Sequence, residues 1–282
     1  MLFFDSHSHV NSSYFKDDSD EVLRRAINNG VATVLVGTDY KSSKKALEMV
    51  SRYQSGVYAA VGLHPDELFD HHEKIAGVET LIRAEVYNGE LYQQLAKFPS
   101  VVAIGEIGLD YHKPEASIEE LKKIKQLQKE VLIKQLVFAM KLNLPVILHC
   151  RQAHDDLIKI LEDFRKQYRT NLPTDRPWGV VHCFSATESI AWQYFNLGLV
   201  ISFTGLITFS QQWDSLIRKM PEDKLLIETD SPFMTPEPYR GRRNEPVLVK
   251  YVANRIAQIK NWDIEKVATT TTNNAKRLFK IV

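Results

Sequence analysis

Residues 117–150 read SIEELKKIKQLQKEVLIKQLVFAMKLNLPVILHC, and they contain a helix pattern followed directly by a strand pattern. Ser117 and Glu120 form the Ser-x-x-Glu pattern of a capping box, in which the two side chains satisfy free backbone amides at a helix start. Apolar residues then recur at helical spacing, namely Leu121, Ile124, Leu127, Val131, Leu132, Leu136 and Ala139. Asn143 and Pro145 end this helix, and the apolar run 145–149 predicts a buried strand.

The same alternation of strands and helices extends over the whole chain, with no low-complexity segment or Gly/Ser linker to divide it. Eight short runs rich in β-branched residues occur at 2–5, 32–37, 57–63, 101–106, 145–149, 179–182, 199–203 and 225–228. Most are continuously apolar, which is typical of parallel strands covered by helices. Eight such repeats in 282 residues predict a (β/α)8 TIM barrel that forms a single domain over residues 1–282. An open doubly wound sheet would give the same alternation, but no glycine-rich G-x-G-x-x-G follows the first strand.

The composition is that of an ordinary globular protein, with 44% hydrophobic and 25% charged residues. No apolar run approaches the ~18 residues of a membrane helix, and Asp5 interrupts the short N-terminal apolar run. We therefore expect a cytoplasmic monomer with no membrane partner. Cys150 and Cys183 form no C-x-x-C pair, and we expect both to be core thiols. The net charge of +1 argues against a broad basic face, so attraction to phosphate would come from a local cluster or bound cations.

The C-terminal ends of the predicted strands carry an unusual set of polar side chains. In a barrel, functional residues lie at this end. Four histidines and two carboxylates occur where five of the strands end: His7, His9, Glu106, His149, His182 and Asp230. Each has a simpler explanation when taken alone, since a His-x-His pair is often an exposed loop and a lone carboxylate is usually a helix cap. Their joint placement at one end of the barrel predicts a metal site.

Six candidate ligands are more than one tetrahedral ion requires, and a closed structural zinc site would use thiolates. The set suits two divalent ions about 3.5–4 Å apart that share a bridging carboxylate and a water. Imidazole and carboxylate ligands fit Zn, Mn, Co or Fe, and Mg where carboxylates dominate. A metal-activated water is the expected nucleophile, and Asp230 is expected to orient it and accept its proton.

Seven motifs occur in a fixed order along the chain: DSHSH, GLHP, EIGLDY, LPVILHCR, HCFS, IETDSP and RGRRNEP. Together with the closing NNAKRLF they resemble the TatD-type metal-dependent deoxyribonucleases of the amidohydrolase-like barrel superfamily. The resemblance assigns the ligands to two ions: His7, His9 and Asp230 to one, His149 and His182 to the other, and Glu106 as the bridge. It also implies hydrolysis of DNA phosphodiester bonds, often as a 3′–5′ exonuclease. Residues 66–99 and 165–178 are longer than this family usually has, and we expect His71 and His72 in the first segment to be surface residues.

Substrate contacts are expected next to these ligands. Arg240, Arg242, Arg243 and Asn244 share one short loop after the last strand, where arginines would bind phosphates of single-stranded DNA or of strand ends. His64, which precedes a proline, is expected to contact phosphate and not metal. For Arg151, a substrate phosphate and a neighbouring carboxylate remain alternatives.

Two other functions fit the same residues. A deacylase acting on an ester or amide, such as misacylated transfer RNA, would use the same metal site on a different bond. A binding protein with structural metals would lack catalysis altogether, although the open His and carboxylate set, without ligating cysteines, argues against it.

Overall fold

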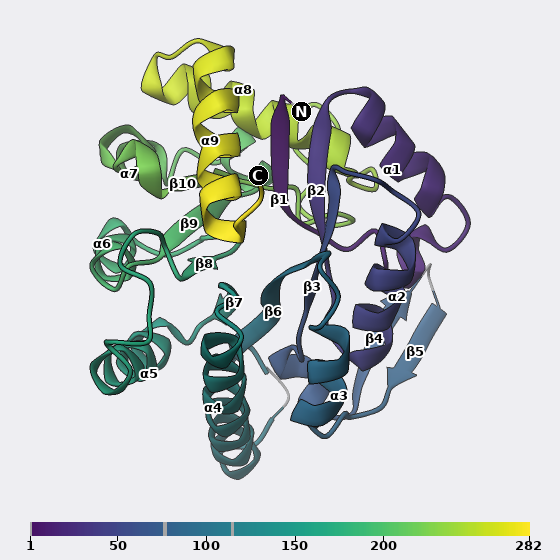
Figure 1. Cartoon of the computed structure of the whole chain (residues 1–282), viewed down its shortest axis with the longest axis vertical. Helices are drawn as coiled ribbons and strands as arrows, with labels where there is room; N and C mark the ends of the chain where they lie inside the picture. The colour runs from purple at the N-terminus through teal and green to yellow at the C-terminus, as the bar shows by residue number, and fades with distance from the viewer. Residues whose placement is uncertain (1, 76–77, 114–115) are drawn as a thin grey trace.

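The computed structural model describes residues 2–75, 78–113 and 116–282, and its centre is an eight-stranded parallel sheet (Figure 1). Neighbouring strands follow the order β1-β2-β3-β6-β7-β8-β9-β10. Their bounds are Phe3–Ser8, Val31–Val36, Val57–Val61, Val101–Asp110, Val146–Arg151, Gly179–Val181, Val200–Phe203 and Leu225–Ile227. Each of the eight predicted runs overlaps one of these strands, so the predicted (β/α)8 barrel is confirmed.

The barrel closes between its first and last strands at their C-terminal ends. Ser8 of β1 and Ser231, just beyond β10, form an isolated parallel bridge. The His9 amide donates to the Ser231 carbonyl at 2.7 Å, and the Asp230 amide donates to the His7 carbonyl at 2.9 Å. This closure places the His-x-His pair beside a carboxylate that is more than 220 residues away in the chain.

Helices surround the barrel on its outside (Figure 1). They are α1 Ser19–Asn28, α2 Tyr40–Val50, α3 Gly89–Leu95, α4 Ile118–Lys141, α5 His154–Gln167, α6 Glu188–Asn196, α7 Asp214–Lys219, α8 Val249–Lys260 and α9 Ile264–Phe279. Short 3₁₀ turns lie at Ser13–Phe15 (η1), Pro65–Leu68 (η2), Gly205–Thr208 (η3), Glu222–Lys224 (η4) and Pro246–Leu248 (η5). The capping box predicted at Ser117 and Glu120 begins α4.

Two apolar clusters divide the core. One lies between the strands and the surrounding helices, and the other contains inward side chains such as Phe4, Val34 and Ile147. Helix α9 contributes Leu278 and Phe279 to this second cluster, and the Phe279 ring stacks on Phe4 with centroids 5.9 Å apart. The end of the barrel where the strands begin is therefore packed shut, and only the opposite end remains for a site.

Strand β6 differs from the prediction, which ended it at Glu106. The strand continues to Asp110, and its pairing with β7 shifts register between Ile104 and Ile107. Gly108 allows β6 to approach β7 closely, because a Cβ at this position would lie 2.0 Å from the His149 carbonyl oxygen. As a result, β6 brings a second carboxylate, Asp110, to the same end of the barrel.

The segment 66–99 contains an antiparallel hairpin of β4 His71–Ile75 and β5 Val78–Ile82, followed by α3. His72 is exposed and His71 is half-buried, as expected for residues outside the metal site. Cys150 and Cys183 form no disulfide with each other, and burial raises the pKa of the Cys150 thiol to about 12. Among the described residues, no helix is long and apolar enough to cross a membrane.

Candidate metal centre

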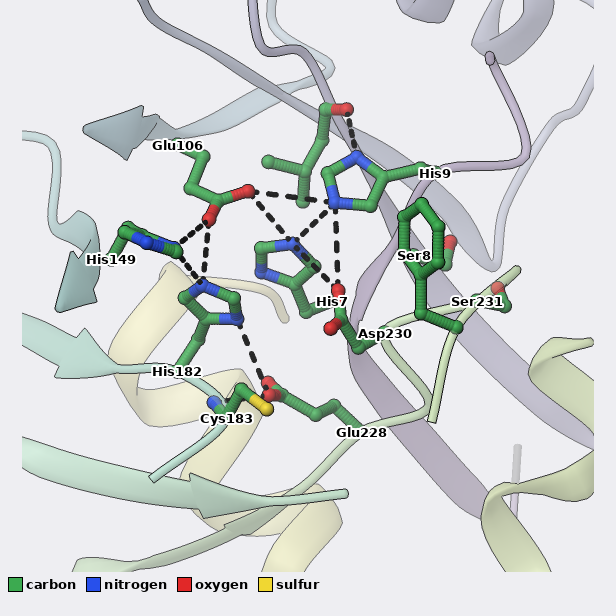
Figure 2. A network of polar contacts seen from close by, with 12 residues as sticks. His7, Ser8, His9, Glu106, His149, His182, Cys183, Glu228, Asp230 and Ser231 are labelled. Carbon is green, nitrogen blue, oxygen red and sulfur yellow. Dashed lines mark hydrogen bonds and ion pairs between the residues drawn. The ribbon is translucent and has the colours of Figure 1, made fainter. Parts of the chain in front are cut away.

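His7 on β1 and His9, just after β1, point their Nε2 atoms at one place in the barrel mouth (Figure 2). The His7 and His9 Nε2 atoms are 2.9 Å apart, and both rings are buried. Asp230 Oδ1 lies 3.7 Å from the His7 Nε2 and 3.6 Å from the His9 Nε2. Donor atoms of all three residues lie within 4.8 Å of one another, which is compact enough for one ion.

The Glu106 carboxylate stands between this group and a second pair of histidines (Figure 2). Its Oε2 lies 3.3 Å from His7 Nε2 and 3.4 Å from His9 Nε2. Its Oε1 lies 2.9 Å from His149 Nδ1 and 2.7 Å from His182 Nε2. Each oxygen therefore faces a different pair of imidazoles, which is the arrangement required of a bridging carboxylate.

The other ring nitrogen of three of these histidines faces an acceptor. His9 Nδ1 is 3.0 Å from the Val36 carbonyl, and His149 Nε2 is 3.0 Å from Asp110 Oδ2. His182 Nδ1 lies 3.5 Å from Glu228 Oε1 but forms no hydrogen bond with the described residues. An acceptor at one nitrogen holds the ring proton there and leaves the lone pair of the other nitrogen free for a metal. In His9 and His149 the free nitrogen is the one that faces Glu106.

The charge balance of the cluster favours cations. Burial would lower the pKa of His9, but hydrogen bonds to Asp230 and Glu106 outweigh it and raise this pKa to about 10. Burial would likewise lower the pKa of His149, but Asp110 and Glu106 raise it to about 9. Burial would raise the pKa of Glu106, yet the facing imidazoles, first of them His182, hold it well below its usual range. Buried carboxylates thus stabilise positive charge here, whether carried by protons or by metal ions.

His7 is favoured in the neutral form that a metal ligand requires. Its Nε2 is the nitrogen beside Asp230 and Glu106, and its Nδ1 is buried without a hydrogen-bond partner among the described residues, as is the Nδ1 of His182. The pKa of His7 is lowered, first by burial and then by the charge of His182, so the neutral ring that a metal requires is favoured. Imidazole and carboxylate donors in an open set fit the divalent ions expected from the sequence.

His64 lies at the edge of this cluster, with its Nε2 3.4 Å from Glu106 Oε1. Its Nδ1 accepts a hydrogen bond of 3.1 Å from the Asp66 amide at the start of η2. Donor atoms of His64, Glu106 and His149 lie within 4.8 Å of one another, so this group could also hold an ion. His64 therefore lies among candidate metal ligands, and the phosphate contact expected for it stays a prediction.

A sequence model of the family described as TatD related DNase matches residues 4–280. This chain belongs to the TatD family. Among the TatD-family relatives, the uncharacterized metal-dependent hydrolase YabD of Bacillus subtilis is 37% identical over 284 residues, covering 99% of this chain and 100% of that protein. The 3′-5′ ssDNA/RNA exonuclease TatD of Escherichia fergusonii is 33% identical over 287 residues, covering 99% of each chain. The crystal structure of YjjV, a TatD homologue from Escherichia coli K12, has a TM-score of 0.82 and 29% identity, covering 100% of this chain and 99% of that chain.

Membership of the TatD family makes this chain a metal-dependent hydrolase. The resemblance inferred from seven motifs is thereby confirmed, and the alternative of a non-enzymatic binding protein is not favoured. The donor groups brought together by the barrel agree with metal dependence.

The arginine loop of this TatD protein departs in part from the expectation. Asn244 is fully buried, and its Nδ2 donates to the Thr229 carbonyl at 2.8 Å and the Phe233 carbonyl at 2.6 Å. Arg243 donates to both carboxylate oxygens of Asp18, at 2.9 and 2.5 Å. Both hydrogens of the Asn244 amide and the Arg243 fork are thus engaged within the protein, so these two residues support the loop instead of offering free donors to a substrate.

The other three arginines expected to contact the substrate form no ion pair among the described residues. Arg240, Arg242 and Arg151 are exposed, and none has a carboxylate within 4 Å in the part of the chain that the structure describes. Arg151 ends β7, two residues after His149, and the absence of an ion pair among the described residues speaks against the carboxylate alternative, so the phosphate contact stays a prediction. Arg240 and Arg242 keep the expected position on the loop after Asp230.

Three buried carboxylates were absent from the sequence prediction. Asp110 and Glu228 face the second nitrogens of His149 and His182, and Glu228 is itself held by the Ser202 hydroxyl at 2.6 Å. Asp5 accepts from the Thr229 amide at 2.8 Å and the Thr229 hydroxyl at 2.7 Å, which fixes the chain just before Asp230. All three lie inside the quoted motifs DSHSH, EIGLDY and IETDSP, so the motifs pointed to them without showing their roles.

Proposed function

We propose that this TatD-family hydrolase removes nucleotides from the 3′ end of single-stranded DNA at a centre of two divalent ions. The observation that carries the proposal is the Glu106 carboxylate, whose two oxygens face two different histidine pairs. His7, His9 and Asp230 would hold one ion, His149 and His182 the other, and Glu106 both. When bound, the ions would neutralise charge on the phosphoryl oxygens and acidify a water.

Asp230 is the residue of this chain best placed to accept the proton of the attacking water. Burial would raise its pKa, but the hydrogen bond from His9, followed by the charges of His7 and His182, lowers it. The carboxylate is therefore ionised at neutral pH and able to act as a base at one of its oxygens. Its position is fixed by the hydrogen bond from its own amide to the His7 carbonyl.

Donors around the barrel mouth would orient the substrate phosphates. Arg240 and Arg242 are exposed on the loop after Asp230, and His64 directs its Nε2 toward Glu106 from the η2 side. Guanidinium groups bind phosphate oxygens through two parallel hydrogen bonds, which suits nucleic acid better than an uncharged ester. The name of the Escherichia fergusonii relative, which describes a 3′-5′ exonuclease acting on ssDNA and RNA, supports the same substrate class.

The test uses purified full-length protein, stripped of metal and then supplied in turn with Mn²⁺, Zn²⁺, Co²⁺ or Mg²⁺. One substrate is a single-stranded oligonucleotide labelled at its 5′ end, so that removal of 3′ nucleotides gives a descending ladder. We expect such a ladder, and we expect a 3′-terminal phosphorothioate to stop it. Asp230→Asn should lower kcat by roughly 10²–10⁴-fold while the far-ultraviolet circular dichroism stays unchanged.

The second arm of the test presents misacylated transfer RNA to the same preparation. Release of amino acid at a higher kcat/KM than nucleotide release would identify the chain as a deacylase and overturn the proposal. Near-normal turnover by Asp230→Asn would place the base elsewhere.

A further inference from the structure

Two aromatic rings are exposed on the loops at the C-terminal end of the barrel. Phe233, three residues after Asp230, is 43% exposed, and Phe209, directly after η3, is 38% exposed. Among the described Phe and Trp residues, the others with comparable exposure are Phe98 at 55% and Trp192 at 38%. Phe98 precedes β6 at the closed end of the barrel, and Trp192 lies on α6. An exposed aromatic ring beside a nucleic-acid site can stack on a base.

Phe233 is held rigidly despite its exposure. Its amide donates to the Asp230 carbonyl at 2.9 Å, and its carbonyl accepts from the buried Asn244 side chain at 2.6 Å. Its ring packs edge-to-face on Tyr14, with centroids 5.6 Å apart and an interplanar angle of 75°. A ring fixed in this way loses little conformational freedom when a ligand stacks on it.

Phe209 is joined to the same surface by contacts between two loops. The Glu237 amide donates to the Thr208 hydroxyl at 2.9 Å. Gly205 allows the loops to touch, because a Cβ there would lie 2.1 Å from the Met234 carbonyl oxygen. The Arg240 guanidinium lies 3.9 Å from the centroid of the Phe209 ring, so a cation and an aromatic ring occur together.

We infer that Phe233, together with the stacked Phe209 and Arg240, binds the bases and backbone of the single strand whose 3′ end enters the metal centre. This inference rests on the proposed function and names the residues that select a single strand. Aromatic rings stack on any base whose face is free, and bases inside a duplex have no free face. Arg240 supplies a positive charge for the adjacent phosphate. The surface is continuous with the site, since the turn from Asp230 to Phe233 is closed by one hydrogen bond.

The experiment couples a change in the protein to a change in the substrate. Phe233→Leu keeps the apolar bulk of the side chain and removes the aromatic ring, and Phe233→Trp keeps an aromatic ring. The substrates are a 12-nucleotide single strand and four derivatives that each lack one base, at the first, second, third or fourth position from the 3′ end. KM and kcat are measured for every pair with the metal-loaded protein.

We expect Phe233→Leu to raise KM on the intact strand roughly ten-fold, with little change in kcat, and Phe233→Trp to restore it. One abasic position should raise the KM of the wild type by a similar factor and leave that of Phe233→Leu unchanged, because the same contact is already missing. Phe98→Leu is the control, since it removes an exposed ring (55% exposed) from the closed end of the barrel, and it should behave as the wild type.

Two results would overturn the inference in distinguishable ways. The first result is a wild-type protein that releases no nucleotides with any of the metals. This result would contradict both the proposed function and this inference. The second result is a wild type that degrades the strand, with increases in KM from Phe233→Leu and from each abasic position that multiply independently. This result would contradict the stacking contact and leave the proposed function standing.

Discussion

At the level of single residues, the site depends on which nitrogen of each histidine carries the proton. The Val36 carbonyl, Asp110 and Glu228 face the nitrogens that point away from the centre of the cluster. The nitrogens left free converge on one carboxylate, so ligand direction is set before any ion binds. Glu106 is the residue common to both halves of the site.

The first prediction concerns Glu106→Gln. The amide keeps the size of the side chain but removes the negative charge that both histidine pairs face, so we expect both ions to bind more weakly. Elemental analysis after saturation and gel filtration should fall from about two ions per chain in the wild type to less than one. Glu188→Gln changes a partly exposed carboxylate on α6 that pairs with Lys219, and as the control outside the metal centre it should keep the wild-type content. One ion bound as tightly in Glu106→Gln as in the wild type would contradict the bridging role.

At the level of elements, the close contact of β6 and β7 positions two ligands at once. Gly108 has a φ of +155°, and a side chain there would collide with the backbone of His149. The same stretch of β6 carries both Glu106 and Asp110. A shift of one strand against the other would therefore separate His149 from both of its carboxylate partners.

Gly108→Ala tests whether the close contact of β6 with β7 positions the candidate metal ligands. Because the added Cβ would lie 2.0 Å from the His149 carbonyl oxygen, we expect a loss of about 2–4 kcal/mol in the free energy of unfolding, together with weaker metal binding. Gly241→Ala is the matched control, since its φ is +82° but nothing lies within 4 Å of the added Cβ. Strain alone should cost it about 1 kcal/mol. Equal losses in the two variants, measured by urea unfolding, would show that the contact of β6 with β7 is not the cause.

The loop after β10 is attached to the N-terminal region by Arg243 and Asp18. Arg243→Ala should lower the free energy of unfolding by about 0.5–1 kcal/mol, because this pair is partly exposed. The hydrogen bond from Arg243 lowers the pKa of Asp18 below 3.8, so this contribution is present above pH 3.8 and is lost as the pH falls through the lowered value. The measurement is urea unfolding of both proteins at pH 7 and near pH 3.

Arg242→Ala is the control for this comparison, since Arg242 is exposed and has no carboxylate within 4 Å among the described residues. It should change the free energy of unfolding by less than about 0.5 kcal/mol. If Arg243→Ala were equally neutral at pH 7, the ion pair would contribute nothing to the position of the loop.

At the level of the whole molecule, the charge is nearly balanced, with 36 basic and 35 acidic side chains. Many charged groups pair with each other on the surface, as Arg255 does with Asp214. Among the described residues, few basic side chains near the barrel mouth lack an ion pair. We therefore expect the protein to bind a strand near its end and not along an extended groove. This balance sets how strongly salt affects the reaction.

We expect a shallow salt dependence of kcat/KM on a short single strand. Two to four phosphate contacts give a slope of about 1.4–2.8 log units per log unit of salt, at about 0.7 for each contact. Replacing Arg240 and Arg242 together by alanine should flatten the slope by about 1.4 and raise KM more than it lowers kcat. A slope near 5 that stays unchanged in the double variant would point to a larger basic surface elsewhere.

The sequence by itself determined the barrel and the chemical nature of its site. Apolar runs and the capping box at Ser117 are local features, and the rule that barrel strands end at one rim turned His7, Glu106 and Asp230 into a single predicted cluster. The end of β6 differs from the predicted run 101–106, because the shift of register in β6 depends on its fit to β7.

Only the tertiary structure decided which partner each polar side chain takes. Asp5 binds Thr229, and Arg243 binds Asp18, across separations of 224 and 225 residues. No local pattern specifies such pairs, because they form only when β1 and β10 meet and close the barrel. The role of Asn244 also depends on tertiary structure, because its amide supports the loop by donating to the Thr229 and Phe233 carbonyls. The sequence shows which candidate metal ligands gather at the barrel rim. Barrel closure decides how these side chains are oriented and which of their nitrogen and oxygen atoms are left for a metal ion.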